Sequence, residues 1–118
     1  MVSREDVHAI ISQLGVGYNY KGARMIESAV LLALEDPGAL QLVTKWIYPQ
    51  VAKELDTTPE RVERNIRTVV EILWDNDRAA FCGVLNRSFH RRPTNSAFLS
   101  AISDLLYLKE RTQLMTGT

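Results

Sequence analysis

Three arginines and a glutamate lie close together in a segment with helical periodicity: Arg61, Glu63, Arg64 and Arg67. Arginine can donate two hydrogen bonds to O6 and N7 of guanine, and glutamate can accept one from N4 of cytosine. On one side of a helix, these side chains could read base edges in the DNA major groove. The alternative is a solvated face, in which Glu60 pairs with Arg64 and Glu63 pairs with Arg67 at the i, i+4 spacing.

An apolar stripe predicts the inward face of this helix: Val62, Ile66, Val69, Val70, Leu73 and Trp74. At about 100° per residue, the opposite side carries Glu60, Arg64, Arg67 and Thr68, with Arg61 and Glu63 on the flanks. Further along, the outer surface becomes acidic at Glu71, Asp75 and Asp77. Acidic side chains repel phosphates, so we expect only the first two turns of the helix to enter a groove.

The residues before this helix predict a shorter helix and a tight turn. The apolar face of the shorter helix would consist of Val51, Ala52 and Leu55. Asp56 would end it, because Asp tolerates left-handed backbone better than most residues. Thr57 or Thr58 can cap the next helix, and Pro59 suits its first position. Residues 49–74 therefore predict a helix-turn-helix.

The rest of the chain is also helical in pattern, and no segment alternates like a strand. Ser3 and Asp6 predict the start of a first helix of about 11 residues, which Gly15 ends. Further helices are expected over residues 23–35, 39–47, 78–85 and 96–110, separated by a glycine-rich loop at 15–22 and a basic loop at 86–95. These segments predict an all-α fold of six or seven helices around one core, as a single domain over residues 1–118. The side chains of Trp46, Trp74 and Cys82 are expected to be buried.

Composition limits the classes of function. The chain has 118 residues, a hydrophobic fraction of 46% and a formal net charge of zero, which fit one folded domain. The charge is uneven, because residues 1–56 carry five basic and seven acidic side chains and residues 57–118 carry nine and seven. Any nucleic-acid surface is therefore a local patch.

Catalytic and metal-binding functions lack support in the sequence. The single Cys82 cannot form an internal disulfide, and neither histidine has partners at a catalytic or metal-ligand spacing. We therefore expect no catalytic site, no metal and no cofactor, and hence no enzyme. The chain has no membrane-spanning run and no signal peptide, so we expect a cytoplasmic protein that associates with the nucleoid when it binds DNA.

Several polar residues outside the arginine row are weaker candidates for contacts with the DNA backbone: Lys21, Thr58, Thr68, Arg91 and Arg92. Arg91 and Arg92 lie in the basic loop just before a helix, where an N-terminus can hold a phosphate. The alternative is an ordinary exposed loop. Lys21 could likewise clamp a phosphate or simply extend into water.

Short motifs follow one another along nearly the whole chain: Leu14-Gly15-Val16, Lys21-Gly22, Thr44-Lys45, Tyr48-Pro49, Val51-Ala52-Lys53, Thr57-Thr58, Arg61-Val62-Glu63-Arg64, Ile66-Arg67, Trp74 and Pro93-Thr94-Asn95-Ser96. With them, the chain resembles the C-terminal effector domain of the stage-zero sporulation response regulator A family. This resemblance implies a helical domain that reads short promoter boxes as tandem homodimers and recruits or blocks RNA polymerase. It also implies base and backbone contacts at the positions of Arg61, Glu63, Arg64 and Arg67.

The chain departs from the family pattern at three places. Thr68 stands where the family usually has histidine, Gly17 replaces a proline, and residues 23–25 replace a more aromatic segment. The family also joins this domain to a receiver that is phosphorylated in a two-component phosphorelay. No such unit occurs in this chain, which leaves an excised domain and a stand-alone protein as the alternatives.

The sequence thus predicts a sequence-specific DNA-binding transcription regulator whose partner is double-stranded DNA. The alternative from another class is a helical protein-interaction module that keeps the helix-turn-helix shape without binding DNA.

Overall fold

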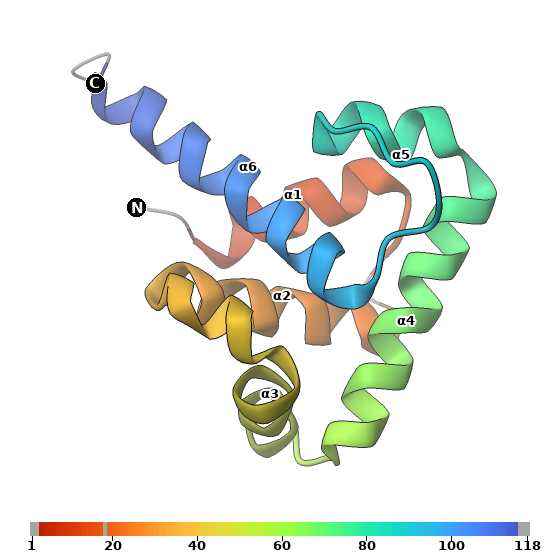
Figure 1. The fold of residues 1–118 in the computed structure, drawn as a ribbon, viewed down its shortest axis with the longest axis vertical. Coiled ribbons are helices and arrows are strands. Elements are labelled where there is room, and N and C mark those ends of the chain that lie inside the picture. Colours follow the sequence, from red (N-terminus) through yellow and green to blue (C-terminus); the bar gives the residue numbers. More distant parts are fainter. Residues whose placement is uncertain (1–2, 18, 116–118) are drawn as a thin grey trace.

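The computed structural model describes residues 3–17 and 19–115, and this part of the chain is helical with no strand. In chain order the elements are α1 (Arg4–Leu14), α2 (Lys21–Glu35), η1 (Pro37–Leu42), η2 (Val43–Ile47), α3 (Tyr48–Glu54), α4 (Pro59–Asn76), α5 (Arg78–Leu85) and α6 (Asn95–Met115). Helix α2 lies at the centre and contacts α1, α3, α4 and α6 (Figure 1). The predicted all-α fold is confirmed.

Local capping fixes helix α1 as predicted. The Ser3 N–H donates to the Asp6 carboxylate at 2.8 Å, and this hydrogen bond lowers the pKa of Asp6. At the other end, Gly15 adopts left-handed backbone with a φ of 104°, which other residues reach only with strain. The apolar stripe between these two ends is buried against the core.

Helix α2 begins at Lys21, two residues before the predicted start at Ala23. The glycine at position 22 suggested a loop, but it serves a close helix contact instead. A Cβ atom on Gly22 would lie 2.3 Å from the backbone oxygen of Asn65 in α4. Only glycine therefore allows α2 and α4 to approach this closely, and the approach fixes the position of the first turns of α4.

Residues 37–47 form a 3₁₀ helix followed by a π-helical turn, where one further helical segment was predicted over 39–47. A π-helix bonds i to i+5, so each turn holds more residues than in an α-helix. Val43 and Ile47 remain buried, but Trp46 is rotated off their side and is 45% exposed. The prediction that Trp46 belongs to the core is wrong, whereas Trp74 is buried as predicted.

An aromatic cluster joins α4, α5 and α6. Phe81 packs edge-on against Trp74, with the ring centroids 5.5 Å apart, and stacks on Phe98 at 5.7 Å. Phe89 packs on the same ring, with the centroids 5.7 Å apart, and so anchors the loop between α5 and α6 to this cluster. Cys82, predicted to be buried, is only partly so, because it lies beside this cluster rather than inside it.

Helix α6 starts one residue earlier and ends later than predicted. The Thr94 side chain accepts a hydrogen bond from the Ala97 N–H at 3.1 Å, so Thr94 caps the helix. The last turns of α6 extend past the other helices (Figure 1). In the part of the chain that the structure describes, no helix is both long enough and apolar enough to cross a membrane.

Candidate nucleic-acid interface

Local chemistry builds the turn between α3 and α4. Asp56 lies in left-handed backbone with a φ of 54°, and the Thr57 N–H donates to a carbonyl of α3 at 2.8 Å. The Thr58 side chain then accepts a hydrogen bond from the Arg61 N–H at 3.3 Å, and Pro59 is the first residue of α4. Of the two residues predicted to cap α4, Thr58 is the one that does so. A short helix, a tight turn and a long helix thus follow one another as predicted (Figure 1).

The first turns of α4 expose a row of arginines. Arg61, Arg64 and Arg67 are exposed, and Glu63 is half-buried. Arg64 lies at the middle of the outer face, whereas Arg61 lies on the flank that faces α2. Arg67 lies on the opposite flank, beside Tyr48 and α6. The structure therefore brings all four residues predicted to read bases together at one end of one helix.

Two of these residues pair with each other. The Arg67 guanidinium lies 2.7 Å from the Glu63 carboxylate, one helical turn away, with side chains 49% and 37% exposed. An exposed pair of this kind stabilises a helix by only about 0.3 to 0.5 kcal/mol. Either side chain can therefore leave the pair to contact another group. The second internal pair that the sequence suggested, between Glu60 and Arg64, is absent among the ion pairs of the described residues.

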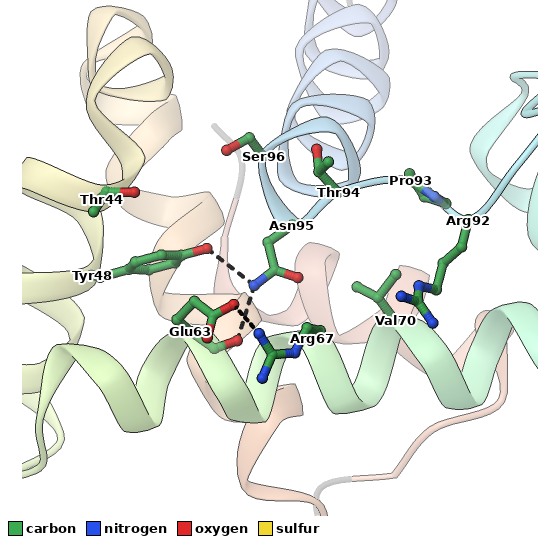
Figure 2. Close-up of a pocket in the computed structure, with 10 residues that line it drawn as sticks. All are labelled: Thr44, Tyr48, Glu63, Arg67, Val70, Arg92, Pro93, Thr94, Asn95 and Ser96. Atoms are coloured by element: carbon green, nitrogen blue, oxygen red, sulfur yellow. Dashed lines mark hydrogen bonds and ion pairs between the residues drawn. The ribbon is translucent and has the colours of Figure 1, made fainter.

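An amide holds this flank of α4 in place. The Asn95 side chain donates to the Tyr48 hydroxyl and to the Glu63 backbone carbonyl, both at 3.0 Å. Figure 2 shows Asn95 between these two groups, at the edge of a hollow of about 350 Å³ that Arg67 and Arg92 also line. Burial raises the pKa of the Tyr48 hydroxyl, and the hydrogen bond from Asn95 lowers it by less. In the sequence, Asn95 was notable only as part of the Pro93-Thr94-Asn95-Ser96 motif.

The basic loop is only partly beside this site. Arg92 lies next to α4, with its guanidinium 3.6 Å from the Glu71 carboxylate. Arg91 is exposed but does not line the hollow, and Arg87 pairs with Asp104 of α6 at 2.9 Å. The loop therefore contributes one arginine, Arg92, to the flank that carries Arg67.

A second hollow, of about 340 Å³, lies on the opposite flank of α4. Lys21 and Arg24 of α2 line it together with Arg61 of α4, and Asp56 and Thr57 of the turn complete its edge. Lys21 was predicted to contact the DNA backbone, whereas Arg24 was not. The signal was the i, i+3 spacing, which places both cations on one side of the helix.

The chain matches the family model described as "Sporulation initiation factor Spo0A C terminal" over residues 7–106. The chain belongs to this family. The Spo0A C-terminal family consists of DNA-binding effector domains of a sporulation response regulator, and it is not a family of enzymes. In full-length proteins of the family, the domain has a receiver domain as its partner. The matched range includes the whole of α2, α3, α4 and α5.

Thr68 is one of the three positions at which the sequence departs from the pattern expected for the Spo0A C-terminal family. The Thr68 hydroxyl donates to the Arg64 backbone carbonyl at 3.0 Å. Its single proton is therefore already used, and in this conformation Thr68 cannot donate to a phosphate oxygen. The Thr58 hydroxyl differs, because it accepts the Arg61 N–H and keeps its own proton to donate.

The site offers hydrogen-bond donors and positive charge. Within the described residues, no group of three or more His, Cys, Asp or Glu side chains could hold a metal ion. The guanidinium, ammonium and hydroxyl groups of the site can bind phosphates and base edges. This fits a Spo0A C-terminal domain, whose task is to bind DNA.

Proposed function

We propose that this chain is a sequence-specific transcription regulator that inserts the first two turns of α4 into the DNA major groove at short promoter boxes. The observation that supports the proposal best is the exposed row of Arg61, Arg64 and Arg67, which directly follows the turn capped by Thr58. A helix-turn-helix presents its recognition helix in this way, with N-terminal residues at the base edges.

The charge along α4 supports entry of only its first turns. Beyond Thr68 the outer surface carries Glu71 and Asp75, and Asp77 follows the helix. A helix laid along the groove over its full length would bring these carboxylates close to phosphates. An end-on approach keeps the acidic end outside, so the arginine end makes the contacts.

Arg64 and Arg61 are suited to bidentate contacts with guanine, each of which discriminates by roughly 1 to 3 kcal/mol. Glu63 and Arg67 would act as a unit, because the Glu63 carboxylate holds the guanidinium of Arg67 at 2.7 Å. In this arrangement Glu63 either accepts from cytosine N4 or orients Arg67 toward its base. The contacts with the DNA backbone would come from Lys21, Thr58 and Arg92, with a smaller contribution from Arg91. Thr68 would contribute only if its hydroxyl proton left the Arg64 carbonyl.

The formal net charge of zero favours binding of two copies side by side. A domain with a formal net charge of zero gains little nonspecific affinity from the DNA backbone. Two copies on adjacent boxes would gain affinity through their proximity, and we propose that the chain binds as a tandem homodimer. The same complex would then recruit or block RNA polymerase in the cytoplasm, under the control of a receiver domain.

The test is a binding selection from random duplexes, followed by titration of the enriched duplex with wild type and Arg64→Ala. A base reader loses discrimination at one base position. A phosphate contact instead weakens all duplexes alike and reduces the salt slope by about one unit. Failure to enrich any motif would favour a helical protein-interaction module.

Arg111→Ala provides the matched control, because Arg111 is an exposed arginine on the last turns of α6. It should bind the enriched duplex as the wild type does. A titration onto one box and onto two adjacent boxes tests the tandem arrangement. Equal affinity per box in the two titrations would contradict it.

A further inference from the structure

We infer that Lys21 and Arg24 of α2 form, with the turn before α4, a binding site for a backbone phosphate of the DNA strand on the α2 side of the recognition helix. This inference rests on the proposed function and adds to it a residue, Arg24, and an assignment of one strand. The two cations lie on successive turns of α2 and line one hollow of about 340 Å³ with Arg61.

The position of the hollow relative to α4 selects the phosphate backbone over the bases. A helix in the major groove, which is about 12 Å wide, has a sugar-phosphate backbone on each side of it. Arg64 faces outward to the bases, whereas Lys21 and Arg24 extend from a neighbouring helix that lies beside the flank of Arg61. They are therefore placed at a groove edge, where phosphates lie.

The close packing of α2 on α4 makes this placement rigid. Gly22 lies between Lys21 and Ala23, and its missing side chain allows the α2 backbone to reach the Asn65 carbonyl of α4. The backbone positions of the two cationic residues are thus fixed relative to the recognition helix. A phosphate contact made by α2, at a set position relative to α4, would fix the register of α4 along the DNA.

The charges in this hollow are not neutralised by the protein. Within the described residues, neither Lys21 nor Arg24 nor Arg61 belongs to any of the ion pairs, and Asp56 is the one carboxylate that lines the hollow. Three cations against one anion leave an excess of positive charge. An incoming phosphate is the ligand that would balance it.

The nearest buried carboxylate, Glu27, forms no ion pair with Arg24 among the described residues. Glu27 lines the adjoining hollow with Arg24, but its Oε1 atom is bound by the guanidinium of Arg4 at 2.6 Å. Arg4 lines the same hollow and offsets the charge of Glu27 at Oε1, whereas the Oε2 atom has no hydrogen-bond partner among the described residues. Arg24 lines both hollows and belongs to none of the ion pairs of the described residues.

The experiment measures binding of a fluorescent duplex carrying the enriched box, and of a scrambled duplex, over a series of salt concentrations. The proteins are wild type, Arg24→Gln, Arg24→Lys and the control Arg111→Gln. We expect Arg24→Gln to weaken binding to both duplexes equally, by roughly five- to tenfold near 0.1 M salt, and to reduce the salt slope by about 0.9. Arg24→Lys should restore most of the affinity, and Arg111→Gln should match the wild type.

The outcomes separate this inference from the proposed function. If Arg24→Gln has the affinity and salt slope of Arg111→Gln, the phosphate site is wrong, whatever the wild type recognises. If Arg24→Gln loses affinity for the box alone, Arg24 reads a base and the site is again wrong. If the wild type binds both duplexes equally, sequence-specific reading fails, but the slope measured on the scrambled duplex still decides the phosphate site. Circular dichroism of each variant checks that it is folded.

Discussion

The side-chain amide nitrogen of Asn95 lies 3.0 Å from the hydroxyl oxygen of Tyr48, and this bond joins α6 to the first helix of the helix-turn-helix. The same nitrogen lies 3.0 Å from the Glu63 carbonyl oxygen of α4. One amide therefore connects the start of α6 to both helices of the motif (Figure 2). The angle between α3 and α4, and with it the position of the arginine row, depends on a residue that follows the motif in the chain.

Asn95→Ala should destabilise the protein and weaken DNA binding together. The substitution leaves the buried Tyr48 hydroxyl without its donor, which costs about 1 to 3 kcal/mol. Tyr48→Phe removes the other partner, so the double variant should cost less than the sum of the two single variants. Urea denaturation of the three proteins measures this coupling. Strict additivity would mean that the hydrogen bond does not join the two helices.

Gly22→Ala should be among the most destabilising small substitutions in this chain. The new Cβ would lie 2.3 Å from a backbone oxygen of Asn65, which cannot rotate away. Overpacking of this kind costs about 1 to 3 kcal/mol. Gly83→Ala is the matched control, because a Cβ there meets nothing within 4 Å, and the change should stabilise α5 by about 0.5 to 1 kcal/mol. Similar unfolding midpoints for the two variants would contradict the close contact of α2 and α4.

The features that sequence predicted correctly depend on near neighbours. The cap of α1 by Ser3 and Asp6, the turn at Asp56 and the cap by Thr58 each involve residues within a few positions, so their chemistry is visible in the letters. The apolar stripe of α4 is periodic for the same reason. The arginine row was therefore placed correctly on the exposed side, although its role in reading bases stays a proposal.

The features that sequence missed depend on partners far along the chain. Gly22 looked like a loop residue because its contact, Asn65, belongs to another helix. Trp46 was assigned to the core because α-helical spacing was assumed, and the π-helical turn changes that spacing. Arg24 and Asn95 acquire their positions only when α2 and α6 pack beside α4.

Arg4→Ala should destabilise the fold although Arg4 itself is largely exposed. Its guanidinium lies 2.6 Å from the Oε1 atom of Glu27, whose side chain is 3% exposed, and the Oε2 atom of Glu27 has no hydrogen-bond partner within the described residues. Removing Arg4 leaves a buried carboxylate without its cation, at a cost of about 1 to 3 kcal/mol. Adding Glu27→Gln should recover part of the loss, because it removes the buried charge.

Arg87→Ala is the control for this pair. Arg87 lies 2.9 Å from Asp104, but both side chains are exposed, at 41% and 56%. Loss of such a pair costs about 0 to 1 kcal/mol. Equal costs for Arg4→Ala and Arg87→Ala in urea denaturation would show that burial of Glu27 adds nothing to the pair.

Glu63→Gln should separate the two roles proposed for the Glu63–Arg67 pair. The change removes one negative charge and releases the guanidinium that Glu63 holds at 2.7 Å. Stability should change by under about 1 kcal/mol, since the pair is exposed. Affinity for scrambled duplexes should rise, because the arginine end of α4 gains net positive charge. Discrimination between the box and the scrambled duplex should fall, and fluorescence titrations of both duplexes measure the two effects.

Asp6→Ala should remove a pH-dependent part of the stability. The Ser3 backbone N–H holds the pKa of Asp6 below its ordinary value of 3.8. A lowered pKa in the folded state means that the contribution is fully present above 3.8 and is lost as the pH falls through the folded-state pKa. The variant should therefore be less stable than the wild type by about 1 kcal/mol at pH 7, and the two should converge in strong acid.

Gln13→Ala, on the same helix, should show a difference that does not vary with pH. A difference for Asp6→Ala that stays constant from neutral pH into strong acid would mean that the carboxylate charge does not stabilise the start of α1.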